Sequence, residues 1–128
     1  QGGDYYINGS NTGYPGGSTS WSSGDIIQIA LDKDNNKVYF GKNGTWMGSG
    51  DPTSGSAGTG AISFSTESHE DWGFAVSAYA STADVNFGNG YFGTSAVSSA
   101  GTNASNNGIF EYDVPAGYTA LSTKGLNL

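Results

Sequence analysis

The stretch from Asp25 to Gly44 constrains the fold of this chain more than any other segment. Two apolar runs, Asp25–Leu31 and Lys37–Lys42, flank a short polar turn, and an Asn43-Gly44 pair follows the second run. β-Branched and aromatic residues fill both runs, as in strands. Asn-Gly supplies the positive φ angles that a tight hairpin turn needs. The stretch therefore predicts antiparallel β structure, and the nearly continuous first run indicates a strand covered on both faces.

Further short apolar runs between turn residues are typical of strands along the rest of the chain. The runs are Tyr5–Ile7, Thr45–Met47, Ala61–Ser65, Trp72–Tyr79, Asp84–Phe87 and Tyr118–Leu121. The polar loop 48–60 is long for a compact domain, which indicates a binding loop or a mobile one. No segment has the pattern of a helix. We expect an all-β fold, an antiparallel β-sandwich with essentially no helix.

Composition excludes several classes of function. The 128 residues include four Lys and no Arg, and the net charge is −7. Nucleic-acid binding needs cations that replace phosphate counterions, so we expect no nucleic-acid partner. The chain has no Cys, which removes disulfides, thiolate nucleophiles and Cys-ligated zinc. No apolar run approaches the length of a transmembrane helix, so we expect no membrane insertion.

Several motifs resemble those of SPRY domains in their order and spacing. Trp21–Asp32 is similar to the conserved strand of that family, and Val38–Gly44 resembles the hairpin that follows it. Trp72–Tyr79, followed by Val85–Gly88, resembles the next pair of strands and the Asn-Phe-Gly signature. Pro115–Leu121 resembles a closing segment of SPRY-like domains in phage virion proteins.

The resemblance implies a concanavalin A-like sandwich of two antiparallel sheets that serves as a binding module without catalytic activity. We expect this domain to span residues 21–128, after a polar, Gly/Ser/Asn-rich N-terminal segment 1–20 that holds at most one short strand. The family's opening strands, which would precede Trp21, are missing. An unpaired sheet edge is therefore expected, which another part of a larger chain or a neighbouring subunit of a homo-oligomeric assembly would fill.

Aromatic side chains beside turns are the main candidates for ligand binding. Tyr and Trp bury large areas at little entropic cost, and their flat faces suit sugar rings. The candidates are Tyr5, Tyr6, Tyr14, Trp46 and Tyr79. In SPRY domains the loop after the strand matched by Trp72–Tyr79 contributes to peptide binding, and this resemblance adds Ser81. For any single aromatic, the alternative is a place at the rim of a thin core. The residues expected in the core are Trp21, Phe40, Trp72, Phe74 and Phe87.

The turn after the first strong strand offers a weak candidate for a metal site. Asp32, Asp34 and Asn36 have the alternating spacing of oxygen ligands in a calcium loop. The pattern fails further on, because Lys37 stands where the Gly is required and Asn43 where the bidentate Glu is required. Asx-rich turns are common without an ion. We therefore expect no metal and no cofactor.

An acidic cluster beside the only His is the candidate for catalysis. Glu67, Glu70 and Asp71 surround His69. Glycoside hydrolysis needs paired carboxylates across a cleft, whereas this cluster lies in a polar turn at irregular spacing. No Ser lies in the Gly-x-Ser-x-Gly elbow of a hydrolase. We therefore expect no catalytic residues and no enzymatic activity.

The sequence favours a non-enzymatic recognition or structural module of an extracellular or phage virion assembly. It would bind a protein partner or a surface glycan through polar and aromatic loops. The expected location is extracellular or in the virion, after synthesis in the cytoplasm. Two alternatives stay open: a carbohydrate-binding lectin, assisted by calcium in one version, and a glycoside hydrolase on the same sandwich.

Overall fold

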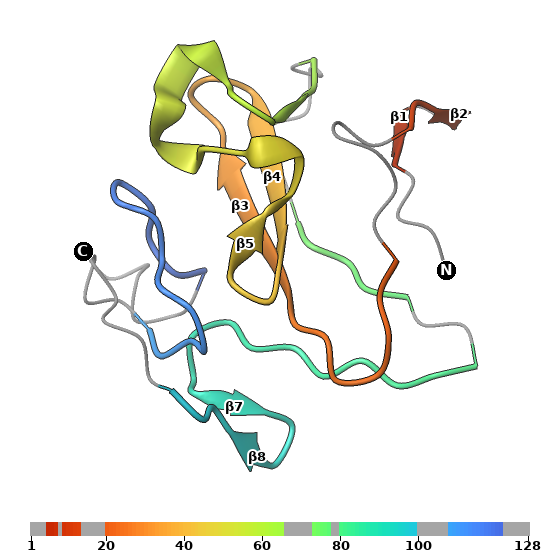
Figure 1. Cartoon of the computed structure of the whole chain (residues 1–128), viewed down its shortest axis with the longest axis vertical. Helices are drawn as coiled ribbons and strands as arrows, with labels where there is room; N and C mark the ends of the chain where they lie inside the picture. Colours follow the sequence, from red (N-terminus) through yellow and green to blue (C-terminus); the bar gives the residue numbers. More distant parts are fainter. Residues whose placement is uncertain are drawn as a thin grey trace. The chain divides into compact units, whose positions relative to one another are not determined.

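Short strands and 3-10 turns make up the regular structure of this chain (Figure 1). The computed structural model describes residues 5–7, 9–13, 20–65, 73–77, 80–99 and 108–121. The chain divides into two compact units, Gln1–Thr66 and Glu67–Leu128. All pairs between the described strands are antiparallel, which confirms an all-β fold with essentially no helix.

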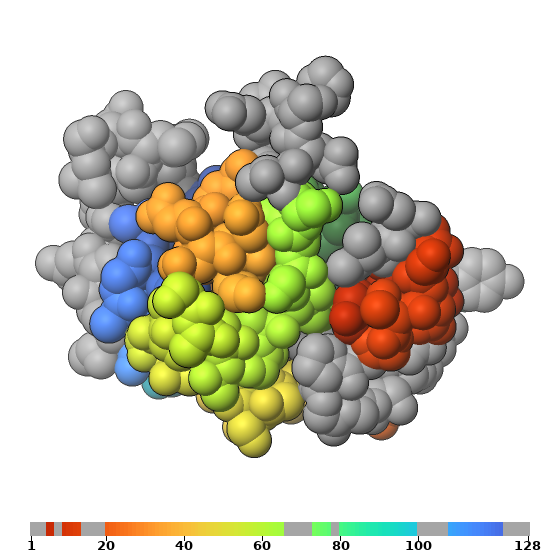
Figure 2. All heavy atoms as spheres, turned by 90° about the horizontal axis from the view of Figure 1, so that it is seen from above, coloured from red at the N-terminus to blue at the C-terminus, as the bar shows by residue number. Residues whose placement is uncertain are grey.

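The first unit is built on a four-stranded antiparallel sheet. β3 (Ile27–Asp32) and β4 (Lys37–Lys42) form the predicted hairpin, and the turn between them lies at the surface (Figure 2). β5 (Thr45–Trp46) and β6 (Ile62–Ser63) both pair with the opposite edge of β4. β4 is therefore the central strand, and among the described residues β3 lies at an edge of the sheet.

Polar side chains close the two turns of this sheet. The Asp32 carboxylate accepts hydrogen bonds from the backbone N of Asn35 at 3.0 Å and from its Nδ2 at 2.8 Å. Asn36 ends that turn with φ 54°. Asn43 and Gly44 take φ 49° and 84°, which confirms the predicted Asn-Gly turn. The sequence of the turns thus determines the register of the strands on either side.

A cover of two 3-10 turns lies over one face of the sheet. η1 (Met47–Ser49) begins one residue before the polar loop 48–60, and η2 (Pro52–Ala57) lies within it. Tyr39, which is 1% exposed, is the largest fully buried side chain among the described residues, and its hydroxyl lies 3.4 Å from Ser54 Oγ. A Cβ on Gly50 would lie 3.6 Å from the Tyr39 ring. The loop that the sequence marked as a binding or mobile loop is therefore a structural cover of the core.

Two small hairpins complete the described strands. β1 (Tyr6–Ile7) pairs with β2 (Ser10–Asn11), as the apolar run at Tyr5–Ile7 predicts. In the second unit β7 (Tyr91–Phe92) pairs with β8 (Ser95–Ala96). An isolated parallel β-bridge pairs Asn89, just before β7, with Ile109 in the later part of that unit.

Several strands predicted in the second unit are wrong. Residues 73–77 of the predicted strand Trp72–Tyr79 form no strand, and neither do Asp84–Phe87 and Tyr118–Leu121. Pairing occurs instead at β7 and β8, and β8 falls inside a segment without strand signals. Gly88, Gly90 and Gly93 follow the predicted strand Asp84–Phe87 and all have positive φ angles, between 58° and 102°, so the backbone turns repeatedly there.

The prediction of an aromatic core also fails at three positions. Trp21, Phe74 and Phe87 are 39%, 38% and 45% exposed. None of them lies in a strand. Phe40 in β4 is half-buried, and Trp72 lies outside the described residues.

Candidate functional site

Edge strand β3 presents a row of unpaired backbone groups. The N–H of Asn43 donates to the carbonyl of Ile26 at 2.9 Å, which identifies the even-numbered residues of β3 as those bonded to β4. The N–H and C=O groups of Ile27, Ile29 and Leu31 therefore point away from β4. Among the described residues, β4 is the one partner strand of β3. Unpaired backbone groups of this kind are a template for another strand.

Apolar side chains occupy the same three positions. Ile27 is 37% exposed and Ile29 is 42% exposed, while Leu31 is half-buried. The expectation that both faces of this strand are covered is therefore wrong. Natural edge strands are usually protected by a charge, a proline or a bulge, and none stands between residues 26 and 31. We call the backbone and side chains of Ile27, Ile29 and Leu31 the β3 edge.

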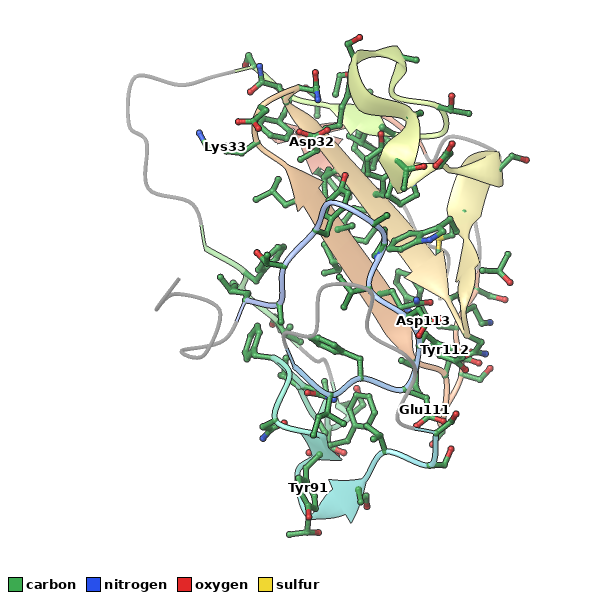
Figure 3. All side chains as sticks on the ribbon, turned by 90° about the vertical axis from the view of Figure 1, so that its left-hand side faces the viewer. Asp32, Lys33, Tyr91, Glu111, Tyr112 and Asp113 are labelled. Atoms are coloured by element: carbon green, nitrogen blue, oxygen red, sulfur yellow. The ribbon has the colours of Figure 1, made fainter. Side chains whose placement is uncertain are left out.

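Charged residues lie at both ends of the β3 edge. At its start, Asp25 Oδ2 lies 2.8 Å from Lys42 Nζ, and the carboxylate accepts 2.7 Å hydrogen bonds from Ser22 N and Asn43 Nδ2. The hydrogen bond from Lys42, followed by those from Ser22 and Asn43, lowers the pKa of Asp25 to about 2. At the other end, the exposed Lys33 extends outward from the tip of the hairpin (Figure 3).

The bonds of Asp25 predict a pH dependence of stability. An unfolded Asp titrates at about 3.9, so the contribution of Asp25 is present above that pH and is lost as pH falls toward about 2. The melting temperature of wild type should therefore fall more steeply between about pH 5 and pH 2 than that of Asp25→Asn. Asp34→Asn changes an exposed acid in the turn and should follow wild type. Parallel profiles for Asp25→Asn and wild type would contradict this role.

The tyrosines proposed for ligand binding at the N-terminal hairpin differ in exposure. Tyr6 in β1 is 64% exposed, and its hydroxyl accepts a hydrogen bond from Asn11 Nδ2 at 3.3 Å. Tyr5 is half-buried. Ser81 is exposed and belongs to the second unit. Tyr14 and Tyr79 lie outside the described residues.

Trp46 packs on its own sheet. It is half-buried in β5 opposite Gly41, and a Cβ on Gly41 would lie 3.1 Å from Trp46 Cε3. The indole therefore covers the space that the missing side chain leaves on β4. The described aromatic candidates of the first unit come from two segments, Tyr5 and Tyr6 at β1 and Trp46 in β5.

The turn at Asp32, Asp34 and Asn36 is closed by its own hydrogen bonds. Both carboxylate oxygens of Asp32 accept from Asn35, as described above. Asn36 Oδ1 is buried without a hydrogen-bond partner. In the described part of the chain, no group of three or more His, Cys, Asp or Glu side chains is placed to hold a metal ion. The acidic cluster at Glu67, His69, Glu70 and Asp71 lies outside the described residues.

A carboxylate in the second unit has a structural role. Glu111 accepts hydrogen bonds from the backbone N of Ser98 at 2.6 Å and from its Oγ. These bonds hold the pKa of Glu111 below its usual value, with the Ser98 hydroxyl as the largest cause. Glu111 and its neighbours Tyr112 and Asp113 lie in one short segment of that unit (Figure 3). Glu111 thus joins this segment to the loop after β8.

Asn86 of the Asn-Phe-Gly motif joins two segments of the second unit. Its Nδ2 donates to the carbonyl of Ile109 at 3.0 Å, and its Oδ1 accepts from Gly88 N at 2.7 Å. Ile109 N returns a 2.9 Å bond to the carbonyl of Gly88. The Asn86 side chain therefore links the segment at Gly88 to the segment at Ile109, and this role is structural.

Replacing Asn86 by Ala should leave the carbonyl of Ile109 and the N–H of Gly88 without their partner. We expect a loss of roughly 1–3 kcal/mol in the free energy of unfolding, measured by urea denaturation. Asn89→Ala removes a single 3.2 Å bond to Tyr91 N and should cost less. Equal losses for the two variants would contradict a bridging role.

No family model, no curated protein and no solved structure matches this chain. In the part of the chain that the structure describes, no helix is long and apolar enough to cross a membrane. The β3 edge is the described feature whose geometry points most directly to contact with another molecule.

Proposed function

We propose that this chain is a non-enzymatic recognition or structural module that joins a protein partner through the β3 edge. The observation that supports this most strongly is the coincidence of unpaired backbone groups and exposed apolar side chains at Ile27 and Ile29. A strand laid against β3 would satisfy those groups and cover those side chains together. Main-chain bonds would supply affinity, and the alternate side chains would supply specificity.

An extracellular or virion assembly is the setting that we propose. The resemblance to SPRY-like domains of phage virion proteins supports it. The net charge of −7 separately disfavours a nucleic-acid partner. In the same proposal, the sheet β3–β6 is one layer of a concanavalin A-like sandwich. Such a module contributes surface complementarity to its assembly, without chemistry of its own.

A library of random nine-residue peptides displayed on a carrier tests this proposal. Wild type should enrich peptides with alternating apolar residues, because these match the period of a strand. Ile29→Lys places a charge in the middle of the apolar row and should lose the enrichment. Thr45→Lys changes an exposed residue of β5 on the same sheet and should behave as wild type. Enrichment that Ile29→Lys retains, or a monomeric wild type that enriches no peptide, would contradict the proposal.

Glycan binding is a second candidate because Tyr6 is 64% exposed on the β1–β2 hairpin. Its ring offers a flat face to a sugar, and Asn11 beside its hydroxyl offers polar groups. On a glycan array, binding that Tyr6→Ala removes and Ile29→Lys keeps would support this candidate. Binding that survives Tyr6→Ala would exclude the tyrosine as its site.

A further inference from the structure

We infer that the strand that fills the β3 edge is β3 of a second copy of this chain. This inference rests on the proposed function, since it names the occupant of the same edge. The two β3 strands would run antiparallel around a twofold axis at Ile29, so that the two four-stranded sheets join into one. A twofold interface requires a surface that is complementary to itself.

The backbone of β3 is arranged for this pairing. With the axis at Ile29, Ile29 faces Ile29 of the second copy, and Ile27 faces Leu31. These are the three residues whose N–H and C=O groups point away from β4. An antiparallel pair forms its close hydrogen bonds at alternate residues, and in this register those residues are the unpaired ones. All three sets of outward groups would therefore find partners.

The side chains along the same row complement the same row of a second copy that runs in the opposite direction. The row consists of Ile27, Ile29 and Leu31 in β3, and Asp25 and Lys33 flank it just outside the strand: an acid, three apolar residues and a base. In the antiparallel pair, Asp25 of each copy faces Lys33 of the other, and apolar residues face each other in between. Cross-strand pairs of opposite charge and of apolar residues both stabilise a sheet.

Alternative registers lose this complementarity. A slip of two residues toward the start of β3 would place Asp25 opposite Leu31 and Lys33 opposite Ser23. A slip of one residue would turn the apolar row to the other face of the joined sheet. The charge pattern therefore selects the register with Ile29 on the axis. The acid is already held in position by Lys42, Ser22 and Asn43.

The overall charge opposes this association, because two copies each carry −7. At about 0.15 M salt, charges farther apart than about 8 Å are largely screened, whereas direct pairs between Asp25 and Lys33 are screened less. We therefore expect the dimer to be more stable at this ionic strength than in dilute buffer.

Light-scattering mass over a dilution series is the first test. Wild type should pass from dimer to monomer as the concentration falls, and its melting temperature should fall with it. Ile29→Lys and Ile29→Glu each place like charges on the axis and should be monomers at every concentration. Mixed in equal amounts, they should recover the dimer, because Lys then faces Glu. Wild type that stays a monomer, or a mixture without recovery, would overturn the inference.

Cysteine cross-linking tests the register, since the chain has no Cys of its own. Facing Cα atoms of a hydrogen-bonded antiparallel pair lie about 5.5 Å apart, within the range that a disulfide spans. Ile29→Cys should therefore form a linked dimer on oxidation. Ile27→Cys is the matched control, because its counterpart lies about 13 Å away along the strand. Equal cross-linking at both positions would overturn the register.

The two proposals fail separately. A monomeric wild type that still enriches strand-like peptides through Ile29 would overturn pairing with a second copy and leave the proposed function standing. A wild type that neither forms a dimer nor enriches peptides would overturn both.

Discussion

Replacing Tyr39 by Ala is expected to lower the free energy of unfolding by about 3–5 kcal/mol, as for other large aromatic side chains deleted from a core. Tyr39 is 1% exposed beneath the cover of η1 and η2. Small domains are stable by about 5–15 kcal/mol, so this loss is a large part of the total. Urea denaturation followed by tryptophan fluorescence measures it.

Two control variants separate packing from hydrogen bonding at this position. Tyr39→Phe keeps the ring and loses a hydroxyl contact of 3.4 Å to Ser54, so it should cost about 1 kcal/mol or less. Tyr91→Ala removes a tyrosine that is 49% exposed and should cost little. If Tyr39→Ala cost no more than Tyr91→Ala, the core would not lie under loop 48–60.

Replacing Gly60 by Ala is expected to cost about 2–5 kcal/mol, the sum of a left-handed backbone and an overpacked site. Gly60 has φ +67°, and a Cβ there would lie 2.5 Å from Gly50 Cα and 2.7 Å from the Gly48 carbonyl oxygen. Backbone atoms of this kind cannot move aside as a side chain does. The variant should therefore displace the cover over Tyr39.

Gly13→Ala is the matched control for this substitution. Gly13 has nearly the same φ, +66°, but its Cβ would meet nothing within 4 Å. It should cost about 1–2 kcal/mol from the backbone alone. The difference between the two variants in the free energy of unfolding measures the steric contribution at Gly60. A similar loss for both would show that the close approach of Gly60 to Gly48 and Gly50 does not matter.

The β3–β4 hairpin could be predicted from the sequence because its determinants are local. Asn43-Gly44 fixes one turn, Asp32 closes the other with its own side chain, and β-branched residues fill the strands between. The strand expected at Trp72–Tyr79 was predicted only from the alternation of large apolar and smaller residues. A strand also needs a partner, which the alternation of one segment does not reveal.

The sequence of loop 48–60 contains residues that predict a helical turn, although its polar composition is typical of an irregular loop. Asp51 accepts hydrogen bonds from Thr53 N at 2.9 Å and Thr53 Oγ1 at 2.6 Å, and Pro52 follows it at the start of η2. An Asp followed by Pro is a typical start of a helical turn. The sequence therefore contained the capping residues of η2, whereas its place over Tyr39 depends on tertiary packing.

The candidate site illustrates the same limit of local patterns. The apolar run that contains Ile27 and Ile29 predicts a strand, but a nearly continuous run cannot tell a covered strand from an edge strand. Only the pairing of the described strands, in which β4 is the one partner of β3, places β3 at the edge. The charges of Asp25 and Lys33 can be related to the register of a second β3 strand only when the edge position of β3 is known.

Amide hydrogen exchange along β3 in dilute solution, followed by NMR, tests most directly whether this edge is free. The amides of residues 28, 30 and 32, which face β4, should be protected, while those of Ile27, Ile29 and Leu31 should exchange rapidly. At high concentration, the second group should gain protection as a partner strand pairs with it. Slow exchange of all six amides at every dilution would show that the edge is already covered, and would contradict the account.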